Sequence, residues 1–268
     1  MGNFYQEINQ PDDQIDLAKA ALYIAQAEYP DLDIDAYLNA LDVMAADVEE
    51  LLPVERYPLR IIQSLNQYFY NDLGFIGNTS DYYDPRNSFL NEVIDRRTGI
   101  PITLSVVYLE VARRIDFPMV GIGMPGHFLI RPEFEDVGIF VDAFNQGEIL
   151  FDSDCEERLA QIYGHPVQMQ PQFIEAVSSR QLLTRMLTNL KLIYLNRKDL
   201  RRALQVVEHI LLLFPDNPME RRDRGLISFQ LGYRSQASQD LEIYLAMLPN
   251  AEDASAIRRL LDQLSREA

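Results

Sequence analysis

Three helices are predicted in the first third of the chain, because apolar residues recur there at helical spacing. They cover residues 12–29, 34–51 and 57–73. Asp12 or Asp13 can cap the first helix. Gly74 follows the third helix, at a position where glycine commonly ends helices. We therefore expect residues 1–87 to form a helical region.

The pattern then changes to a short helix and a fully apolar one. Residues 88–96 read as the short helix, and Pro101 stands where prolines open helices. The run ITLSVVYL, residues 102–109, is apolar almost all round. A helix that is apolar on every side is typical of the centre of a core.

Three strands are predicted next, over 118–124, 126–131 and 138–144. If the last two pair as a hairpin centred between residues 134 and 135, the numbers of paired residues sum to 269, and His127 lies opposite Asp142. Opposed side chains share one face of a sheet, with Cβ atoms ~4.5 to 5.5 Å apart. The register therefore predicts an imidazole–carboxylate hydrogen bond, whereas a slip of one residue would separate the two groups.

From residue 182 onward the sequence is helical and repeats at a spacing of 34 residues. The matched pairs are Ala203 with Ala237, Leu211 with Leu245, and Pro215 with Pro249. Thirty-four residues is the length of a tetratricopeptide-type helix-turn-helix repeat. We expect two degenerate repeats, 184–217 and 218–251, followed by a capping helix over 252–266. Arg221 and Arg224 depart from the pattern, because apolar residues are expected at their positions.

The distribution of charge supports a division into two domains. Residues 1–99 hold 18 acids and 6 bases, and residues 100–179 hold 12 acids and 4 bases. Residues 180–268 hold 11 acids and 14 bases. We expect one domain over 1–178, with its core at 88–152, and a repeat domain over 180–268.

Composition narrows the classes of function. A net charge of −17 disfavours binding to nucleic acid, whose affinity comes largely from clustered lysine and arginine. The sequence contains neither an apolar run of the ~18 to 20 residues that span a membrane nor a cationic leader, which predicts a cytoplasmic protein without membrane contact. The single cysteine, Cys155, excludes an intrachain disulfide and a multi-cysteine metal site. We expect no cofactor and no metal.

Three stretches of the sequence resemble a bacterial family of transglutaminase-like proteins with a C-terminal tetratricopeptide-like region. They are NSFLNEVIDRRTGIPITLSVVYLEVARRIDFP, GIGMPGHFLIRP and FVDAFNQGEIL. The resemblance implies an α+β fold. Its expected parts are a helical N-terminal region, a papain-like core with one buried helix and a small antiparallel sheet, and C-terminal helical repeats.

The resemblance also implies a catalytic triad. In the wider superfamily a cysteine opens the central helix, and a histidine and an aspartate follow on successive strands. The histidine corresponds to His127 and the aspartate to Asp142, although Ala143 follows where a proline is usual. Thr103 stands at the cysteine position. Asn91 is a weaker candidate, as a donor to an oxyanion.

Because Thr103 stands in place of the cysteine, two main hypotheses remain for the function of the protein. A hydroxyl has a far higher pKa than a thiol, so it needs a base and an aligned oxyanion hole to attack. The first hypothesis is a silent or weakly active core in a protein that binds another protein or a peptide through its repeats. The second is an amidase, peptidase or acyltransferase that uses Thr103 with His127 and Asp142. Cys155 lies among four carboxylates, which raise the pKa of a thiol and make it a poor substitute.

A third hypothesis is nucleic-acid binding by Arg221, Arg222 and Arg224. It rests on this short cluster alone.

Overall fold

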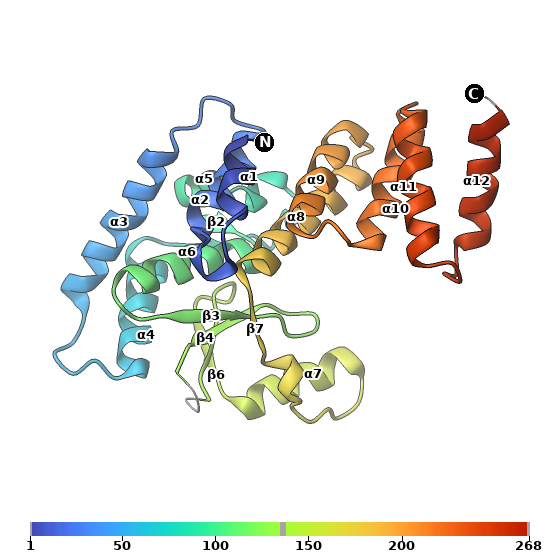
Figure 1. Ribbon diagram of the computed structural model, residues 1–268. Helices are drawn as coiled ribbons and strands as arrows, with labels where there is room; N and C mark the ends of the chain where they lie inside the picture. The colour runs from blue at the N-terminus through green and yellow to red at the C-terminus, as the bar shows by residue number, and fades with distance from the viewer. Residues whose placement is uncertain (1, 135–137, 267–268) are drawn as a thin grey trace. The chain divides into compact units, whose positions relative to one another are not determined.

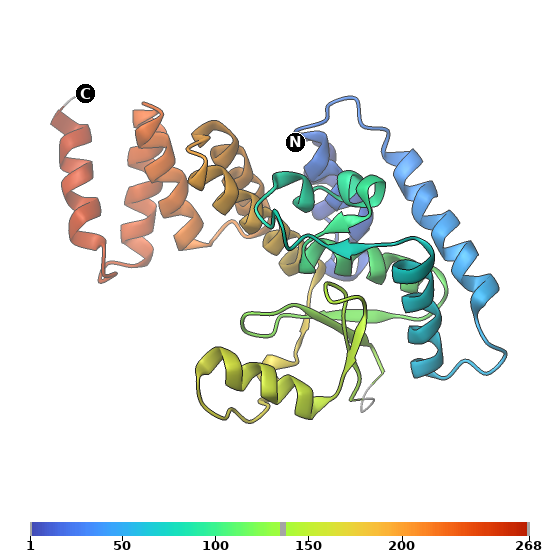
Figure 2. The same cartoon turned by 180° about the vertical axis from the view of Figure 1, so that it is seen from behind.

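The fold is described from a computed structural model, which covers residues 2–134 and 138–266. Figures 1 and 2 show the chain from opposite sides. It forms two compact units, Met1–Met186 and Leu187–Ala268. The first contains helices and a sheet, and the second is helical. The α+β fold class predicted from the sequence is confirmed.

The first unit begins with a group of helices. They are α1 Gly2–Ile8, a 3₁₀ turn at Asp12–Gln14, α2 Leu17–Gln26, α3 Ile34–Leu51, and α4 Pro58–Asn66, which continues as a π-helix over Gln67–Asp72. The bounds of α3 agree with the predicted segment. The predicted helix over 12–29 is instead broken, because Asp16 caps a new helix by accepting a hydrogen bond from the Lys19 amide at 3.0 Å.

The central helix is α6, Pro101–Arg114, and every residue from 102 to 112 is buried. The short helix α5, Leu90–Arg96, and a two-stranded parallel sheet precede it, formed by β1 Ile76–Gly77 and β2 Thr98–Gly99. Burial on all sides explains why the sequence of α6 has no polar face.

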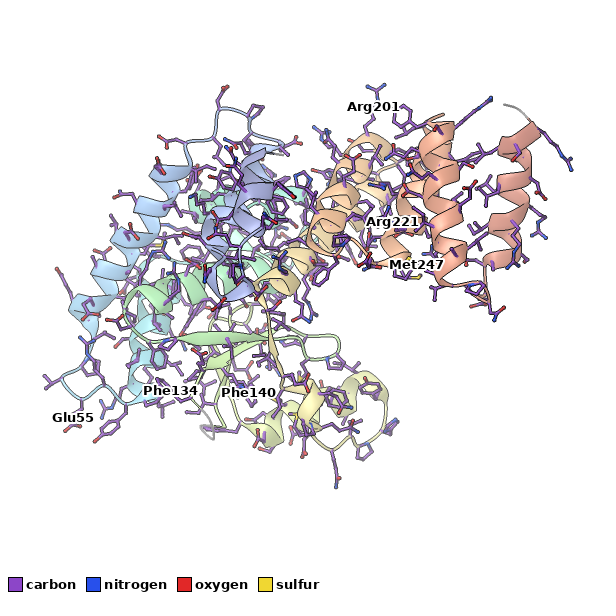
Figure 3. The ribbon with its side chains drawn as sticks, in the orientation of Figure 1. Glu55, Phe134, Phe140, Arg201, Arg221 and Met247 are labelled. Atoms are coloured by element: carbon purple, nitrogen blue, oxygen red, sulfur yellow. The ribbon has the colours of Figure 1, made fainter. Side chains whose placement is uncertain are left out.

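A five-stranded antiparallel sheet lies against α6, in the strand order β6-β5-β4-β3-β7. Its strands are β3 Met119–Ile122, β4 Leu129–Pro132, β5 Phe140–Asp142, β6 Glu148–Leu150 and β7 Ala176–Val177. Helix α7, Asp152–Tyr163, covers the opposite face from α6 (Figure 1). Phe140, Cys155 and Leu159 belong to the apolar cluster between the sheet and α7. In Figure 3 Phe140 lies within this layer, whereas Glu55 projects from the loop after α3.

The second unit consists of helix pairs. Helix α8, Ser179–Asn196, extends into it and is followed by α9 Leu200–Leu213, α10 Pro218–Gln230, α11 Arg234–Met247 and α12 Ala254–Arg266. Of the positions that carried the repeat pattern, Ala203, Leu211 and Ala237 are buried, Leu245 is partly buried, and the two prolines that end the repeats are exposed. The two repeats and capping helix predicted from the spacing of 34 correspond to these elements.

Arg221 and Arg224, the departures from the repeat pattern, share one buried carboxylate. Asp240 on α11 is 1% exposed, and its two oxygens accept from Arg224 Nε at 2.6 Å and Nη2 at 2.7 Å. Arg221 Nη1 lies 3.4 Å from the same carboxylate. The second repeat has therefore replaced an apolar contact by a buried ion pair, which satisfies the charge of both arginines.

None of the helices in the described part of the chain is both long and apolar enough to cross a membrane.

Candidate functional site

His127 lies in the turn that joins β3 to β4, where its amide donates to the Met124 carbonyl at 3.0 Å. It was predicted to lie on a strand in a register with sum 269, and this prediction is wrong. Ile130 pairs with Val141, so the sum is 271. The predicted hairpin centre borders residues 135–137, which lie outside the described residues. His127 therefore reaches Asp142 from the turn before β4, not from a directly opposed position on a strand, and the predicted hydrogen bond is present.

Asp142 ends β5 and is fully buried. Its Oδ2 accepts from His127 Nε2 at 2.6 Å and from Asn145 Nδ2 at 2.8 Å, while Oδ1 accepts the amides of Phe144 and Asn145, each at 3.1 Å. Burial alone would raise the pKa of this carboxyl. Hydrogen bonds from His127, Asn145 and Arg158 outweigh burial and hold the pKa well below its usual range. Asp142 is thus a carboxylate at neutral pH.

Arg158, on α7, is the third member of this cluster. Its Nη1 donates to Asp142 Oδ2 at 2.5 Å, and its Nη2 donates to Glu148 Oε2 at 2.5 Å. The sequence did not single out Arg158. It did hold a signal, since Arg158 is the sole lysine or arginine between 132 and 179, a stretch with ten acidic residues.

The contacts of Arg158 also determine the tautomer of His127. Arg158 Nη1 lies 2.9 Å from His127 Nε2, but a guanidinium nitrogen only donates. A ring nitrogen that donates to Asp142 cannot accept from Arg158 at the same time. We therefore assign the proton to Nε2, with both donors sharing Asp142 Oδ2. In the neutral ring, Nδ1 is then the nitrogen that can accept a proton.

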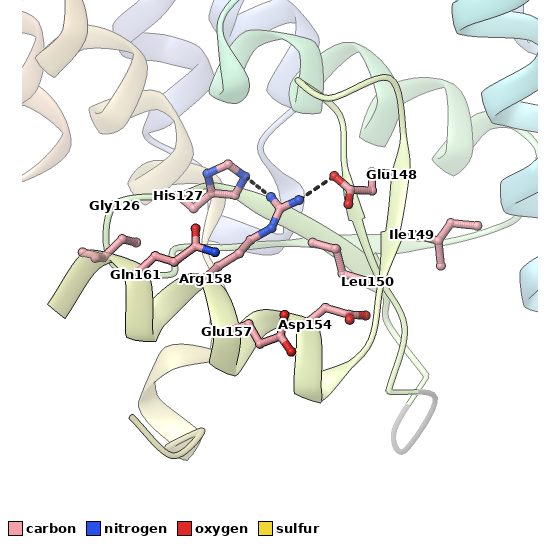
Figure 4. Close-up of a pocket in the computed structure, with 10 residues that line it drawn as sticks. Gly126, His127, Glu148, Ile149, Leu150, Asp154, Glu157, Arg158 and Gln161 are labelled. Carbon is pink, nitrogen blue, oxygen red and sulfur yellow. Dashed lines mark hydrogen bonds and ion pairs between the residues drawn. The ribbon is translucent and has the colours of Figure 1, made fainter. Parts of the chain in front are cut away.

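A pocket of about 570 Å³ lies beside this cluster, between α7 and the turns of the sheet (Figure 4). Its lining includes His127, Arg158, Glu148, Asp154, Glu157 and Ile162. Figure 4 shows the Arg158 guanidinium between the imidazole and Glu148. The pocket therefore places an imidazole, a paired guanidinium and several carboxylates around one space.

The turn after Asp142 is fastened to the N-terminal helices. Asn66 Nδ2 donates to the Gly147 carbonyl at 2.7 Å, and Tyr70 in the π-helix donates to the Ala143 carbonyl at 3.0 Å. Gly147 has a φ of +70°, and a Cβ there would lie 2.2 Å from Asn66 Oδ1. Tyr108 on α6 holds Asn66 from the other side, through a 3.0 Å hydrogen bond to Oδ1. These contacts fix the turn that presents Asp142.

Thr103 lies in the first turn of α6 and is fully buried. Its hydroxyl donates to the Asn87 carbonyl at 2.7 Å and accepts from the Ile100 amide at 3.2 Å. Among the residues that the structure describes, its hydrogen bonds go to backbone groups, and none joins it to His127. The structure therefore brings His127 and Asp142 together but does not link Thr103 to them.

The remaining candidates lie apart from this cluster of hydrogen bonds. Asn91 on α5 is 4% exposed, and its Oδ1 has no hydrogen-bond partner in the described part of the chain. Cys155 is buried under the sheet, and burial together with Asp152 and Asp154 raises the pKa of its thiol to about 12. Within residues 2–134 and 138–266, no group of histidine, cysteine and acidic side chains has a geometry suited to a metal ion.

The third hypothesis, nucleic-acid binding, is disfavoured because its three arginines are already paired with carboxylates. Arg221 and Arg224 are paired with Asp240, and Arg222 pairs with Asp223 at 3.0 Å and Asp253 at 3.1 Å. Phosphate binding would have to compete with these carboxylates.

Comparison with known proteins agrees with the two units. Residues 35–188 match the family model described as transglutaminase-like superfamily, and residues 190–262 match a tetratricopeptide repeat model. A UPF0162 protein of Xylella fastidiosa is 38% identical, with 96% of this chain and 92% of that protein covered. A UPF0162 protein of Vibrio cholerae is 28% identical, with coverage of 96% and 95%.

A partial relative is also found outside bacteria. Human F-box only protein 21 is 27% identical over 87% of this chain, which spans 41% of that protein. No solved structure matches. By its core, its repeats and these relatives, the chain belongs to the transglutaminase-like superfamily.

Proposed function

We propose that this protein is a catalytically silent member of its superfamily and acts as a protein- or peptide-binding module, in the cytoplasm. The observation that carries the proposal is the state of Thr103. Its hydroxyl proton is committed to the Asn87 carbonyl, and its oxygen accepts the Ile100 amide. These are the bonds of a residue that caps the start of a helix.

A hydroxyl nucleophile must hand its proton to a base during attack. Thr103 would first have to break its 2.7 Å bond to Asn87 and become accessible from a fully buried position. Cys155 offers no replacement, because burial and two neighbouring aspartates raise the pKa of its thiol to about 12. These observations favour a core without an operating nucleophile.

The binding half of the proposal is supported by the repeats. Tetratricopeptide repeats generally mediate protein interactions through the surfaces of stacked helices. Leu192 on α8 and Met219 on α10 are 49% and 43% exposed, so each of these helices offers an apolar side chain to a partner. The pocket beside His127 is the second contact region that we propose.

An enzymatic alternative is favoured by one observation, the 2.6 Å hydrogen bond between His127 and Asp142. An imidazole oriented by a carboxylate is the arrangement that activates a nucleophile. In this alternative, Thr103 acts as the nucleophile of an amidase, peptidase or acyltransferase, and Asn91 donates to the oxyanion.

Covalent labelling separates the two functions. The full chain is incubated with hydroxyl-reactive electrophiles, namely a fluorophosphonate, a sulfonyl fluoride and a β-lactone, and adducts are located by mass spectrometry. We expect no adduct on Thr103. An adduct on Thr103 that is lost in His127→Ala would establish the enzymatic alternative.

Peptide display against the full chain tests binding. We expect enriched peptides whose affinity falls in Leu192→Glu but not in Val43→Glu. Val43 is a matched control because it is 52% exposed on α3, outside the repeats. Failure to enrich any peptide, or equal losses in both variants, would contradict binding by the repeats.

A further inference from the structure

The pocket beside His127 has walls of two kinds. Ile162 of α7 packs over Gly126, where an added Cβ would lie 2.9 Å from Ile162 Cδ1. Leu150 and Ile149 of β6 also line the space. The same lining includes the carboxylates of Glu148, Asp154 and Glu157. A lining that combines apolar groups with carboxylates suits a ligand group that has a hydrocarbon stem and a polar end.

The ion pairs among the lining residues indicate whether the polar end of the bound group is an anion or a cation. Arg158 is the sole cationic side chain among the lining residues apart from His127, and both of its terminal nitrogens are bonded to carboxylates. An anion at the guanidinium would therefore compete with Asp142 and Glu148 and would be repelled by the unpaired Glu157 beside it. A cation at Glu157 meets no such competition.

The carboxylates of the lining, in contrast, have oxygens that accept no hydrogen bond from the described residues. Glu157 is exposed and has no hydrogen bond or ion pair with the described residues. Glu148 uses Oε2 for Arg158, and Asp154 uses Oδ2 for the Phe151 amide, which leaves one oxygen on each. Three carboxylates with unused oxygens line the same space as the apolar residues, so the lining offers a cation more than one acceptor.

The charge of the whole unit acts in the same direction. Residues 1–186 carry 30 acidic and 12 basic side chains, whereas residues 187–268 carry 11 acidic and 12 basic ones. The first unit, which contains the pocket, thus carries a formal charge of −18 and the second unit +1, so all of the net negative charge belongs to the first. A potential of this sign attracts cationic segments and raises the rate of their association.

We propose that this pocket receives the side chain of a lysine or arginine from a bound polypeptide, with the aliphatic stem against Ile162 and Leu150 and the cationic end among Glu157, Asp154 and Glu148. The inference rests on the proposed function, because it specifies the chemistry of the segment that the module binds. No covalent step is involved. Asp142 and Glu148 contribute by binding the Arg158 guanidinium, so that it does not neutralise Glu157.

The test titrates the full 268-residue chain, labelled with ¹⁵N, with three short peptides. The peptides are N-acetyl-Ala-Lys-Ala amide, its arginine analogue, and a norleucine analogue, which keeps the stem but lacks the charge. We expect the lysine and arginine peptides to shift the amide signals of Gly126, His127 and Gln161. The norleucine peptide should bind more weakly than the lysine peptide, by a factor of up to about 5, because it loses one partly exposed ion pair.

Substitution of the free carboxylate provides the matched comparison. Glu157→Gln should lower the affinity for the lysine peptide about 3- to 5-fold and leave the affinity for the norleucine peptide unchanged. Glu50→Gln removes the same charge from an exposed position on α3 and should change neither. Raising the salt concentration should weaken the lysine peptide more than the norleucine peptide.

The outcomes separate this inference from the proposed function. If all three peptides bind in the pocket with equal affinity, the preference for a cation is overturned while peptide binding stands. If none shifts these signals at millimolar concentration, the pocket is not a peptide site, and binding by the repeats is judged by the Leu192→Glu comparison alone. If Glu157→Gln and Glu50→Gln weaken the lysine peptide equally, the effect belongs to overall charge and the proposed site is wrong.

Discussion

Arg158 and His127 donate to the same atom, Oδ2 of Asp142, at 2.5 and 2.6 Å. The donors to this carboxylate, which stands in the superfamily's triad position, thus include an imidazole and a permanent cation. The guanidinium balances the charge of Asp142, so the imidazole need not be protonated to keep this buried carboxylate ionised. This arrangement gives Asp142 a role in stability, whether or not the site reacts.

Arg158→Met should lower the free energy of unfolding by about 2 kcal/mol, because it leaves the buried Asp142 without its permanent counter-charge. Urea unfolding at pH 7 measures the loss. Arg113→Met is the control, since Arg113 is mostly exposed and its partner Glu110 keeps a second contact with Arg114. Equal losses in the two variants would show that the Asp142 pair is no stronger than a surface pair.

The lowered pKa of Asp142 predicts a specific dependence of stability on pH. Its pKa in the folded state lies below the unfolded value of about 3.9. Its contribution is therefore fully present above about pH 4 and is lost as the pH falls through that value toward the folded pKa. Between pH 5 and pH 3 the wild-type chain should lose more unfolding free energy than Asp142→Asn, measured in urea. Parallel curves for the two proteins would contradict this assignment.

Thr103→Cys, in a Cys155→Ala background, should give a thiol that iodoacetamide alkylates slowly under native conditions. The reason is that residue 103 is fully buried and has no bond to His127 among the described contacts. The alkylation rate of the same thiol in urea, where the chain is unfolded and the thiol is exposed, is the reference for comparison. Rapid native alkylation that is lost in His127→Ala would mean that position 103 faces the imidazole after all.

Gly147→Ala should destabilise the chain by about 2 kcal/mol or more, because it adds a steric clash to the strain of a positive φ. The new Cβ would lie 2.2 Å from Asn66 Oδ1. Gly164→Ala is the control, since Gly164 has a similar φ of +73° and open space around it. Thermal unfolding compares the two, and an equal shift in Tm would exclude a steric contribution from Asn66.

Much of the fold could be predicted because local patterns determine it. The bounds of α3 and the burial of α6 followed from apolar periodicity, and the repeats followed from their spacing. The break at Asp16 was missed because one side-chain cap outweighs a continuing apolar pattern. The hairpin register was wrong because its loop is longer than assumed, with β4 ending at Pro132 and β5 starting at Phe140.

Less of the candidate site than of the fold could be predicted from the sequence. The contact between His127 and Asp142 was predicted from a hairpin register that is wrong, and their catalytic role stays a prediction. Arg158 belongs to α7, which follows β6, so its position depends on how α7 packs against the sheet, which no local pattern shows. The bond from Thr103 to the Asn87 carbonyl joins residues 16 apart and was equally hidden.

The hydrogen bond from Asn66 to Gly147 connects residues 81 positions apart. A fragment limited to the predicted core, 88–152, would lack Asn66 and Tyr70 and so would leave the Asp142 turn without these anchors. The N-terminal helices are therefore part of the site's scaffold. A substitution in α4 or the π-helix could alter the site without changing any residue that lines the pocket, and such positions would be overlooked by a search confined to the triad.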